Sequence, residues 1–392
     1  MTPISTTAEL AAFCASLKGE PFIAVDTEFM RETTYWPKLC LVQVAGAKDA
    51  ACIDPLAEDI DLTPLLDLMR DTSILKVFHA ARQDVEIFNN LGAMPLPLFD
   101  TQVAGMAAGF GEQIAYDALV RQMLKIEIDK SSRFTDWSRR PLSEAQLSYA
   151  LADVTHLAKL FPMLRERLEK AGRWAWVASE MGSLTDPAIY DVDPDNAWKR
   201  LRPRKHTVKY LAVFRAVAAW RERTAQQRDQ PRGRILKDEA IDEIATQAPT
   251  SGDALNNMRS VPKGFAGSKF GPDLIAAVKA ALADPDAYAP VLAKPGPPPP
   301  QSAGAVVELL KVLLKARAED AGVASKLIAT VSDLEKIAAS QDDTADTPAL
   351  TGWRREAFGE DALKLKRGEL ALVLDGSRVR VVEVRRTPRP AG

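Results

Sequence analysis

Four short apolar runs in the first 80 residues constrain the fold more than any other feature of this sequence. They span residues 22–28, 39–45, 50–55 and 74–80. The first three follow one another after short breaks, whereas helical patterns such as "LTPLLDLMR" and "DVEIFNNLG" follow the third and the fourth. Strands that first adjoin and then alternate with helices indicate a mixed sheet flanked by helices. We therefore predict an α/β fold for the first half of the chain.

Helical patterns dominate after residue 100. Residues 143–172 are predicted to form one long helix or two, with Ser143 as the N-cap and Gly172 as the stop. Helical patterns continue through most of the remaining chain. The last residues differ, because two β-rich arms flank Asp375 and Gly376, a combination that predicts a terminal β-hairpin.

Proline-rich stretches divide the chain into units. Three prolines among aspartates indicate a connector, and the run "AKPGPPPPQSAG" is the clearest linker, since consecutive prolines favour an extended spacer. The predicted organisation is an α/β unit at 1–190, a connector at 191–204, a helical unit at 205–288, a Pro-rich linker at 289–303 and a mainly helical third unit at 304–392.

The composition limits the classes of function. The chain has 392 residues, no apolar run of eighteen, and no secretory signal at its start, so we expect no membrane partner. Its three cysteines show no C-x-x-C spacing, which fits reduced thiols in the cytoplasm and argues against zinc. The net charge of −2 does not favour a nucleic-acid partner, yet residues 199–237 are strongly basic. Such a region either binds phosphates or forms a solvated helix face.

Two acids, Asp26 and Glu28, stand at the end of the first apolar run. Side chains two residues apart in a strand point the same way, so the two carboxylates would project together. Like charges placed side by side repel each other unless a cation or a proton intervenes. The pair is therefore either a solvated strand end or part of a site for a hard divalent ion such as Mg²⁺ or Mn²⁺.

Three more residues complete a candidate site. Asp84 lies just beyond the fourth run, near a predicted helix start, where an acid also serves as a cap. Tyr149 and Asp153 are four residues apart in a predicted helix and share one of its faces, either as site residues or as a core aromatic and a surface charge. Apolar neighbours surround Asp153, and a partly buried acid needs a partner, which a metal would provide.

The order D-x-E, D, Y-x-x-x-D that these five residues form resembles the tyrosine-type branch of the DEDD superfamily of 3′-5′ exonucleases. The sister branch carries a histidine where this chain has Ser148. The flanks are also similar to those of the ribonuclease D family, in "VDTEFMRETTYWPKLCLVQVA", "FHAARQDVEIF" and "KSSRFTDWSRRPLSEAQLSYALADV". The resemblance covers roughly residues 1–290.

The resemblance implies a ribonuclease H-like fold and a metal-dependent 3′-5′ exoribonuclease. Asp26, Glu28, Asp84 and Asp153 would hold two divalent ions, Mg²⁺ or Mn²⁺, and Tyr149 would orient the attacking water. Two metals about 4 Å apart serve both ends of an in-line displacement. The products would be nucleoside 5′-monophosphates from RNA 3′ ends, with tRNA precursors as expected substrates of a monomeric, cytoplasmic enzyme.

Eight further residues are candidate RNA contacts. Two of them directly follow the first acid pair, one lies on the neighbouring strand, and one closes the fourth strand. The other four belong to "DKSSRFTDWSRR", where basic residues surround an aromatic, a combination that suits single-stranded RNA. The candidates are Phe29, Met30, Gln43, His79, Lys130, Arg133, Trp137 and Arg139. Core packing of the aromatic residues and a structural hydrogen bond from the histidine are the alternative interpretations.

The second half resembles HRDC domains, small helical modules. Residues 205–285 are similar to one HRDC domain, and the third unit is predicted to be a second, divergent one, from which the terminal hairpin departs. Two other functions are alternatives. The same catalytic core serves DNA-directed 3′-5′ exonucleases, and a decayed core would leave a non-catalytic RNA-binding adaptor, against which the intact acids and tyrosine count.

Overall fold

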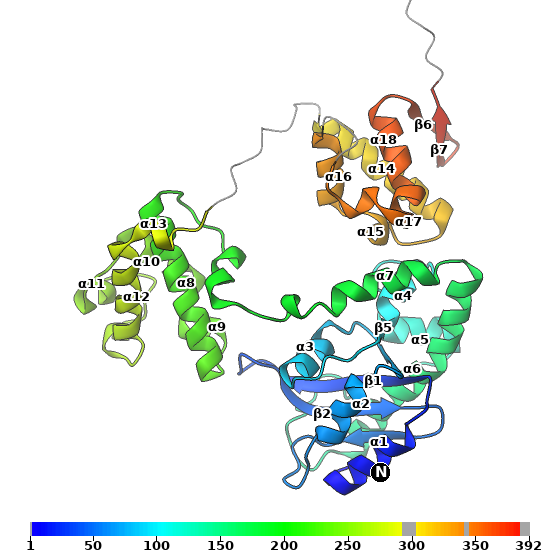
Figure 1. Ribbon diagram of the computed structural model, residues 1–392, viewed down its shortest axis with the longest axis horizontal. Helices are drawn as coiled ribbons and strands as arrows, with labels where there is room; N and C mark the ends of the chain where they lie inside the picture. The colour runs from blue at the N-terminus through cyan, green and yellow to red at the C-terminus, as the bar shows by residue number, and fades with distance from the viewer. Residues whose placement is uncertain (1, 292–302, 341–344, 385–392) are drawn as a thin grey trace, which may run out of the picture.

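The first unit is built on one five-stranded sheet (Figure 1). The computed structural model describes residues 2–291, 303–340 and 345–384. The strands are β1 (Phe22–Met30), β2 (Lys38–Ala45), β3 (Ala50–Ile53), β4 (Leu75–Phe78) and β5 (Leu98–Asp100), in the spatial order β3-β2-β1-β4-β5. The first three strands pair antiparallel, whereas β4 runs parallel to β1 and β5 parallel to β4. The predicted mixed sheet is thus confirmed.

β1 occupies the middle of this sheet, and its sequence explains why. Its first half is apolar and largely buried, and its polar residues begin at Asp26, where the strand leaves the core. In the antiparallel register, Asp26 lies opposite Gln43 and Glu28 opposite Leu41. The register shifts between Glu28 and Phe29, so the alternation of faces is interrupted directly after the second acid.

Seven helices accompany the sheet. They are α1 (Thr7–Ser16), α2 (Thr63–Arg70), α3 (Arg82–Asn90), α4 (Thr101–Ala107), α5 (Tyr116–Leu124), α6 (Glu144–Lys170) and α7 (Trp174–Leu184). Residues 144–170 form one helix rather than two, and a capping box between Ser143 and Gln146 fixes its start. α6 packs across β1, β2 and β3 and so covers the face from which Asp26 projects.

The fifth strand was absent from the prediction. β5 has only three residues and follows Pro95 and Pro97 closely, so no apolar run of strand length marks it. β5 is specified by its pairing with Lys76, Val77 and Phe78 of β4 and not by an apolar run of its own.

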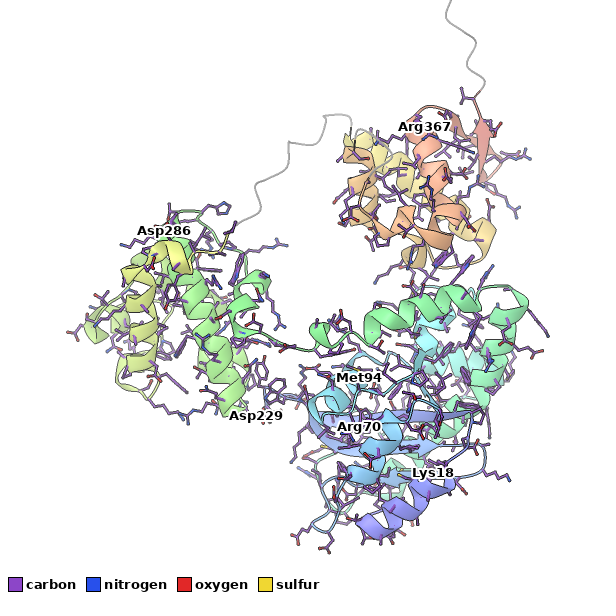
Figure 2. All side chains as sticks on the ribbon, in the orientation of Figure 1. Lys18, Arg70, Met94, Asp229, Asp286 and Arg367 are labelled. Atoms are coloured by element: carbon purple, nitrogen blue, oxygen red, sulfur yellow. The ribbon has the colours of Figure 1, made fainter. Side chains whose placement is uncertain are left out.

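The second unit is helical, as predicted. Its helices are α8 (Val208–Arg228), α9 (Arg232–Ile235), α10 (Asp238–Gln247), α11 (Gly252–Asn256), α12 (Gly271–Ala283) and α13 (Pro285–Tyr288), with a 3-10 turn at Phe265–Gly267. Two more 3-10 turns, Pro187–Ile189 and Pro194–Arg200, precede this unit. Asp229, at the end of α8, faces the first unit (Figure 2). Its Oδ1 accepts hydrogen bonds from the backbone N–H groups of Tyr35 (3.0 Å) and Trp36 (2.9 Å).

The third unit is mainly helical and ends in the predicted hairpin. It consists of α14 (Ala303–Ala321), α15 (Ser325–Ile328), α16 (Val331–Ala339), a 3-10 turn (Pro348–Leu350), α17 (Gly352–Arg354), a π turn (Arg355–Gly359), α18 (Glu360–Lys366), β6 (Leu370–Asp375) and β7 (Arg378–Glu383). β6 and β7 pair antiparallel around Gly376, which has the positive φ that such a turn requires.

Some sequence predictions fall outside these findings. The five unit boundaries stay predictions, and the linker at 289–303 lies largely outside the described residues. The interpretation of 304–392 as a second HRDC unit also stays a prediction. Within the described part of the chain, no helix is both long and apolar enough to cross a membrane.

Candidate active site

Three of the five predicted site residues meet at the end of β1. One carboxylate oxygen each from Asp26, Glu28 and Asp153 lies within 4.8 Å of the other two. β1 supplies the first two side chains, and the face of α6 that packs on the sheet supplies the third. Oxygen atoms from several carboxylates are the donors that hard divalent cations prefer, so this group fits a Mg²⁺-type ion.

Asp84 approaches the same place from the first turn of α3. It is buried, and its Oδ1 accepts a hydrogen bond of 2.5 Å from the hydroxyl of Thr27, the residue between the two β1 acids. Thr27 thereby ties the start of α3 to β1. Burial, and after it the charge of the nearby Asp26, raises the pKa of Asp84 well above its ordinary value.

Burial and mutual repulsion act together on these acids. Burial first, and then the charge of Asp153, raises the pKa of Asp26 from 3.8 to about 8. Burial and the neighbouring carboxylates raise the pKa of Glu28 from 4.5 to about 9. Burial raises the pKa of Asp153 to about 7, although Tyr149 and Arg133 oppose the shift. Without a cation, the site therefore retains protons near neutral pH.

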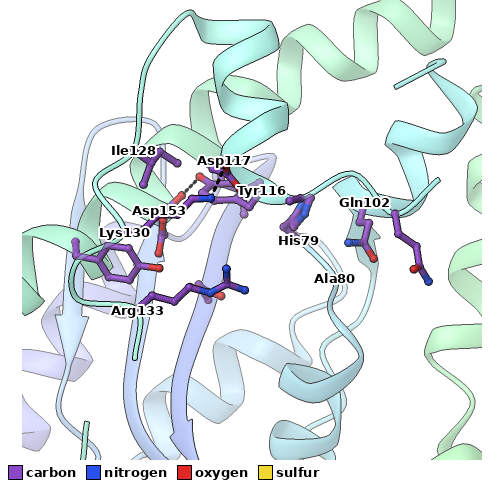
Figure 3. Close-up of a pocket in the computed structure, with 14 residues that line it drawn as sticks. His79, Ala80, Gln102, Tyr116, Asp117, Ile128, Lys130, Arg133 and Asp153 are labelled. Atoms are coloured by element: carbon purple, nitrogen blue, oxygen red, sulfur yellow. Dashed lines mark hydrogen bonds and ion pairs between the residues drawn. The ribbon is translucent and has the colours of Figure 1, made fainter. Parts of the chain in front are cut away.

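Tyr149 and Arg133 both interact with the carboxylates of the site. Tyr149 lies one helical turn before Asp153, and its hydroxyl lowers the pKa of that acid. Arg133, from the loop between α5 and α6, lowers the pKa of both Glu28 and Asp153. Figure 3 shows Arg133 and Asp153 projecting into the same cavity.

This cavity has a volume of about 520 Å³ and opens beside the acids. Its lining includes Asp26, Tyr149 and Asp153 together with Lys130 and Arg133. The Nζ of Lys130 pairs with Asp117 at 2.6 Å (Figure 3), and contact of this half-exposed lysine with RNA stays a prediction. Arg139, in the same loop, is exposed and pairs with Asp136 at 3.2 Å.

The other predicted RNA contacts differ in accessibility. Phe29 and Met30 are half-buried next to the acids, so contact with RNA stays a prediction for both. His79 lines the cavity, but its Nδ1 lies 3.0 Å from the Thr101 hydroxyl and its Nε2 3.1 Å from the Ile114 carbonyl oxygen. Both ring nitrogens are thus engaged within the protein.

Two predicted RNA contacts are buried in this structure. Trp137 is 2% exposed and packs with Cys40 and Leu147 beneath α6, so its ring cannot stack on a base without leaving the core. Gln43 is 0% exposed and cannot touch a sugar. Within the described residues, neither amide atom of Gln43 has a hydrogen-bond partner, although Asp26 lies directly across the strand pair.

Two residues of the site were missed. The hydroxyl of Tyr116 donates to the main-chain carbonyl oxygen of Asp153, and its ring packs 5.3 Å from that of His79. Asp100 accepts the N–H groups of Ala80 (3.0 Å) and Ala81 (2.9 Å), which lead into α3. No local sequence signal marks either role, since each bond joins segments far apart in the chain.

The fold and the acidic site together define a class of protein. Residues 1–169 match a family described as 3′-5′ exonuclease, and residues 210–278 match the HRDC domain family. The mixed five-stranded sheet flanked by helices agrees with the ribonuclease H-like fold that the resemblance implies. The predicted fold class is confirmed.

Relatives that align with nearly the whole chain identify one family within this class. The chain is 54% identical to ribonuclease D of Nitrobacter hamburgensis over 98% of its own length and all of the relative's. It is 50% identical to ribonuclease D of Granulibacter bethesdensis, covering 97% of this chain and 96% of that one. The crystal structure of Escherichia coli RNase D, described as an exoribonuclease involved in structured RNA processing, superposes with a TM-score of 0.78 at 28% identity, covering 94% and 99%. The chain belongs to the ribonuclease D family of 3′-5′ exoribonucleases.

Proposed function

We propose that this exoribonuclease uses two divalent ions, Mg²⁺ or Mn²⁺, held by Asp26, Glu28, Asp84 and Asp153. The observation that carries the proposal is the convergence of three carboxylates within 4.8 Å, with pKa values raised to between about 7 and 9. Such a group is unfavourable when fully ionised and empty, and divalent cations relieve the repulsion.

The chemistry divides between the ions and the side chains of the chain. Divalent ions bound to these carboxylates would activate water and stabilise the leaving oxygen of a phosphodiester. Tyr149 would orient the attacking water, because its hydroxyl lies beside Asp153. Arg133, which faces the same acids, would offset the charge that develops on the phosphate.

We further propose RNA with a free 3′ end as the substrate, with tRNA precursors among its natural forms. The function of the Escherichia coli relative in structured RNA processing supports this choice. The products are nucleoside 5′-monophosphates. Three buried, unpaired cysteines within the described chain are in keeping with a reducing cytoplasm, and we expect a monomer there.

The test uses the purified full-length chain with a 3′-hydroxyl RNA. With Mg²⁺ or Mn²⁺ we expect shortening by one nucleotide at a time and release of 5′-monophosphates. Asp26→Asn and Asp153→Asn should reduce kcat by about a thousandfold or more, since each removes a carboxylate from the site. Asp49→Asn, at an exposed acid outside the site, is the matched control and should retain wild-type kcat.

Chelation separates this mechanism from the alternatives. EDTA should abolish hydrolysis, and activity that persists in EDTA would contradict a metal-dependent mechanism. The matching oligodeoxynucleotide should be a poorer substrate than the RNA. Equal rates on both polymers would favour a general 3′-5′ exonuclease, and binding of RNA without hydrolysis would favour the adaptor.

A further inference from the structure

Phe134 stands out on the surface of the loop between α5 and α6. It is 90% exposed, whereas Trp137, three residues later in the same loop, is 2% exposed. Among the described residues, the other large exposed aromatic is Tyr288, and it has only 37%. Exposure of a whole phenyl ring to water is unfavourable because of the hydrophobic effect, so we expect a binding partner at this position.

The loop that carries Phe134 is firmly attached on both sides of it. Trp137 anchors it in the core beneath α6. The guanidinium of Arg140 pairs with Asp54 at 2.6 Å and also donates to the carbonyl oxygen of Cys40 at 2.6 Å. Ser132, on the other side, is buried. The exposure of Phe134 is therefore a consequence of a fixed loop and not of a loose one.

The ring also has a defined relation to the acidic cavity. The guanidinium carbon of Arg133 lies 5.2 Å from the ring centroid of Phe134, within the range of a cation–π contact. The same guanidinium lowers the pKa of Glu28 and Asp153. One arginine thus faces both Phe134 and the carboxylates, which places the ring at the edge of the cavity.

We propose that Phe134 is a stacking platform for an unpaired base of the RNA, upstream of the terminal nucleotide that occupies the cavity. The proposal rests on the function proposed above, because that function supplies a single-stranded 3′ end to this cavity. Stacking of a base on an aromatic ring tolerates any sequence, which suits an enzyme that removes nucleotides one after another. Arg133 would accompany the phosphate that joins the stacked and terminal nucleotides.

The surroundings favour a nucleobase over a protein partner. Exposed polar residues flank the ring, namely Ser131, Arg133 and Asp136. A protein-docking surface has a contiguous apolar centre, whereas a single exposed ring beside an arginine is typical of single-strand nucleic-acid paths. Arg133 forms no ion pair within the described chain, so its charge is available to a phosphate.

The decisive measurement locates stacking directly. RNA carrying 2-aminopurine at successive positions from its 3′ end is bound to the full-length Asp26→Asn chain, which prevents cleavage. Stacking quenches 2-aminopurine, so we expect quenching at one or two adjacent upstream positions that Phe134→Ala abolishes. In fluorescence anisotropy, Phe134→Ala should weaken RNA binding by roughly 5-fold to 150-fold.

Two substitutions and one control identify the chemistry of the contact. Phe134→Trp should bind RNA at least as tightly as the parent, and Phe134→Leu should bind nearly as weakly as Phe134→Ala, because leucine is apolar but has no π-face. Leu374→Ala removes a 79% exposed apolar side chain from the terminal hairpin and should leave binding unchanged. Binding by Phe134→Leu equal to that of the parent would overturn the stacking interpretation, as would an equal loss in Leu374→Ala.

Kinetics keep this proposal separate from the function on which it depends. In the chain with native Asp26, Phe134→Ala should raise KM for RNA while kcat is retained. If the wild-type chain shortens RNA but Phe134→Ala has the same KM, only the stacking proposal is wrong. If the wild-type chain does not shorten RNA, the function itself is wrong. A change in the molecular mass of Phe134→Ala by light scattering would instead identify Phe134 as a contact between copies of the chain.

Discussion

Repulsion among Asp26, Glu28 and Asp153 governs the site at the scale of single residues. Each carboxylate is at least partly shielded from water, and each has a pKa raised by burial and, for the two on β1, by its neighbours. A buried cluster of acids stays protonated or binds cations. Proton binding and metal binding are therefore linked here, and pH controls both.

This linkage predicts how the metal-free protein responds to pH. The folded chain keeps protons on these acids up to about pH 7 to 9, whereas the unfolded chain releases them near their ordinary values of 3.8 and 4.5. Because the folded state binds more protons between these limits, the free energy of unfolding falls as pH rises from about 5 to 9. Mg²⁺ requires ionised ligands, so it should stabilise more at high pH. Calorimetry at pH 6 and 8.5 should show the Tm gap between Mg²⁺ and EDTA widening.

Asp26→Asn is the control for this prediction. The substitution removes one of the repelling charges, so metal-free Asp26→Asn should have a higher Tm than the metal-free wild type at pH 8.5. Its Tm should also respond less to Mg²⁺. A Tm gap in the wild type that stays constant or narrows with rising pH would contradict the linkage.

The five catalytic candidates were predictable from sequence, but the accessibility of their neighbours was not. Strand periodicity alone places Asp26 with Glu28, and helix periodicity alone places Tyr149 with Asp153. The basic residues around Trp137 suggested this ring as an RNA contact and gave no signal for Phe134, although the structure buries the first and exposes the second. Loops have no periodicity, so sequence alone does not tell which of two nearby aromatic rings points inward.

At the scale of elements, α6 carries the site and needs to be held in place. Its residues Tyr149 and Asp153 reach the cavity only at one rotation and height of the helix over β1. Tyr116, at the first position of α5, contributes a hydrogen bond from its hydroxyl to the carbonyl oxygen of Asp153. His79 packs on the ring of Tyr116 and bonds the Ile114 carbonyl two residues before it.

We predict that Tyr116→Phe weakens the metal site through α6. Loss of the hydroxyl should lower the free energy of unfolding by about 1 kcal/mol, and the concentration of Mg²⁺ for half-maximal activity should rise about tenfold. Metal titration of activity together with chemical denaturation measures both. Tyr190→Phe is the matched control, because Tyr190 is also buried and donates to a carbonyl oxygen, that of Leu184 at 2.6 Å in α7. It should cost similar stability without changing the metal requirement, and equal metal requirements in both variants would refute a positioning role for Tyr116.

The strands show why some elements were predicted and another was missed. β1, β2, β3 and β4 each contain an apolar run that local pattern detects. β5 is three residues long, and its Asp100 both caps α4 and fixes Ala80 and Ala81 ahead of Asp84. Such a residue is specified by tertiary contacts, which no window of sequence contains.

At the scale of the whole molecule, both C-terminal units contact the exonuclease unit. Trp353 of the third unit stacks on Trp176 of α7 at 4.3 Å and 6°, and Arg354 pairs with Glu180. The third unit also donates a backbone hydrogen bond to the exonuclease unit, from Ala324 N–H to the Met106 carbonyl oxygen at 3.0 Å. These contacts join residues more than 170 positions apart and were not predictable from the sequence of either unit.

In the basic region at residues 199–237, composition alone does not show how much of the charge is free. Several of its cations are paired with acids: Arg221 with Asp238 at 2.6 Å, Arg223 with Asp195 at 2.9 Å, and Arg232 with Glu222 at 2.5 Å. Only part of its charge therefore remains for phosphates. Glu222, Asp229 and Arg232 also bind the loop that follows β1.

That loop inserts Tyr35 into the second unit. Tyr35 is 5% exposed, and its ring lies 4.6 Å from the guanidinium carbon of Arg232. Its hydroxyl donates to Glu222 Oε1 at 2.5 Å and accepts from Arg232 at 2.9 Å. The HRDC unit is thus attached to the same segment of chain that leaves the catalytic strand, five residues after Met30.

We predict that Tyr35→Ala detaches the HRDC unit while the exonuclease unit stays folded. Truncation of a buried aromatic costs about 3 to 5 kcal/mol, which is large for an interface between domains. Small-angle scattering should show a larger radius of gyration, and protease should cut the segment 191–204 faster. KM should rise for long RNA but not for a dinucleotide, because the dinucleotide is too short to reach α8.

Tyr35→Phe keeps the ring and the backbone bonds to Asp229, so its scattering should stay close to wild type. If Tyr35→Ala scatters like the wild type, the tyrosine does not hold the units together, and the contacts of the third unit with α7 are sufficient to fix the arrangement.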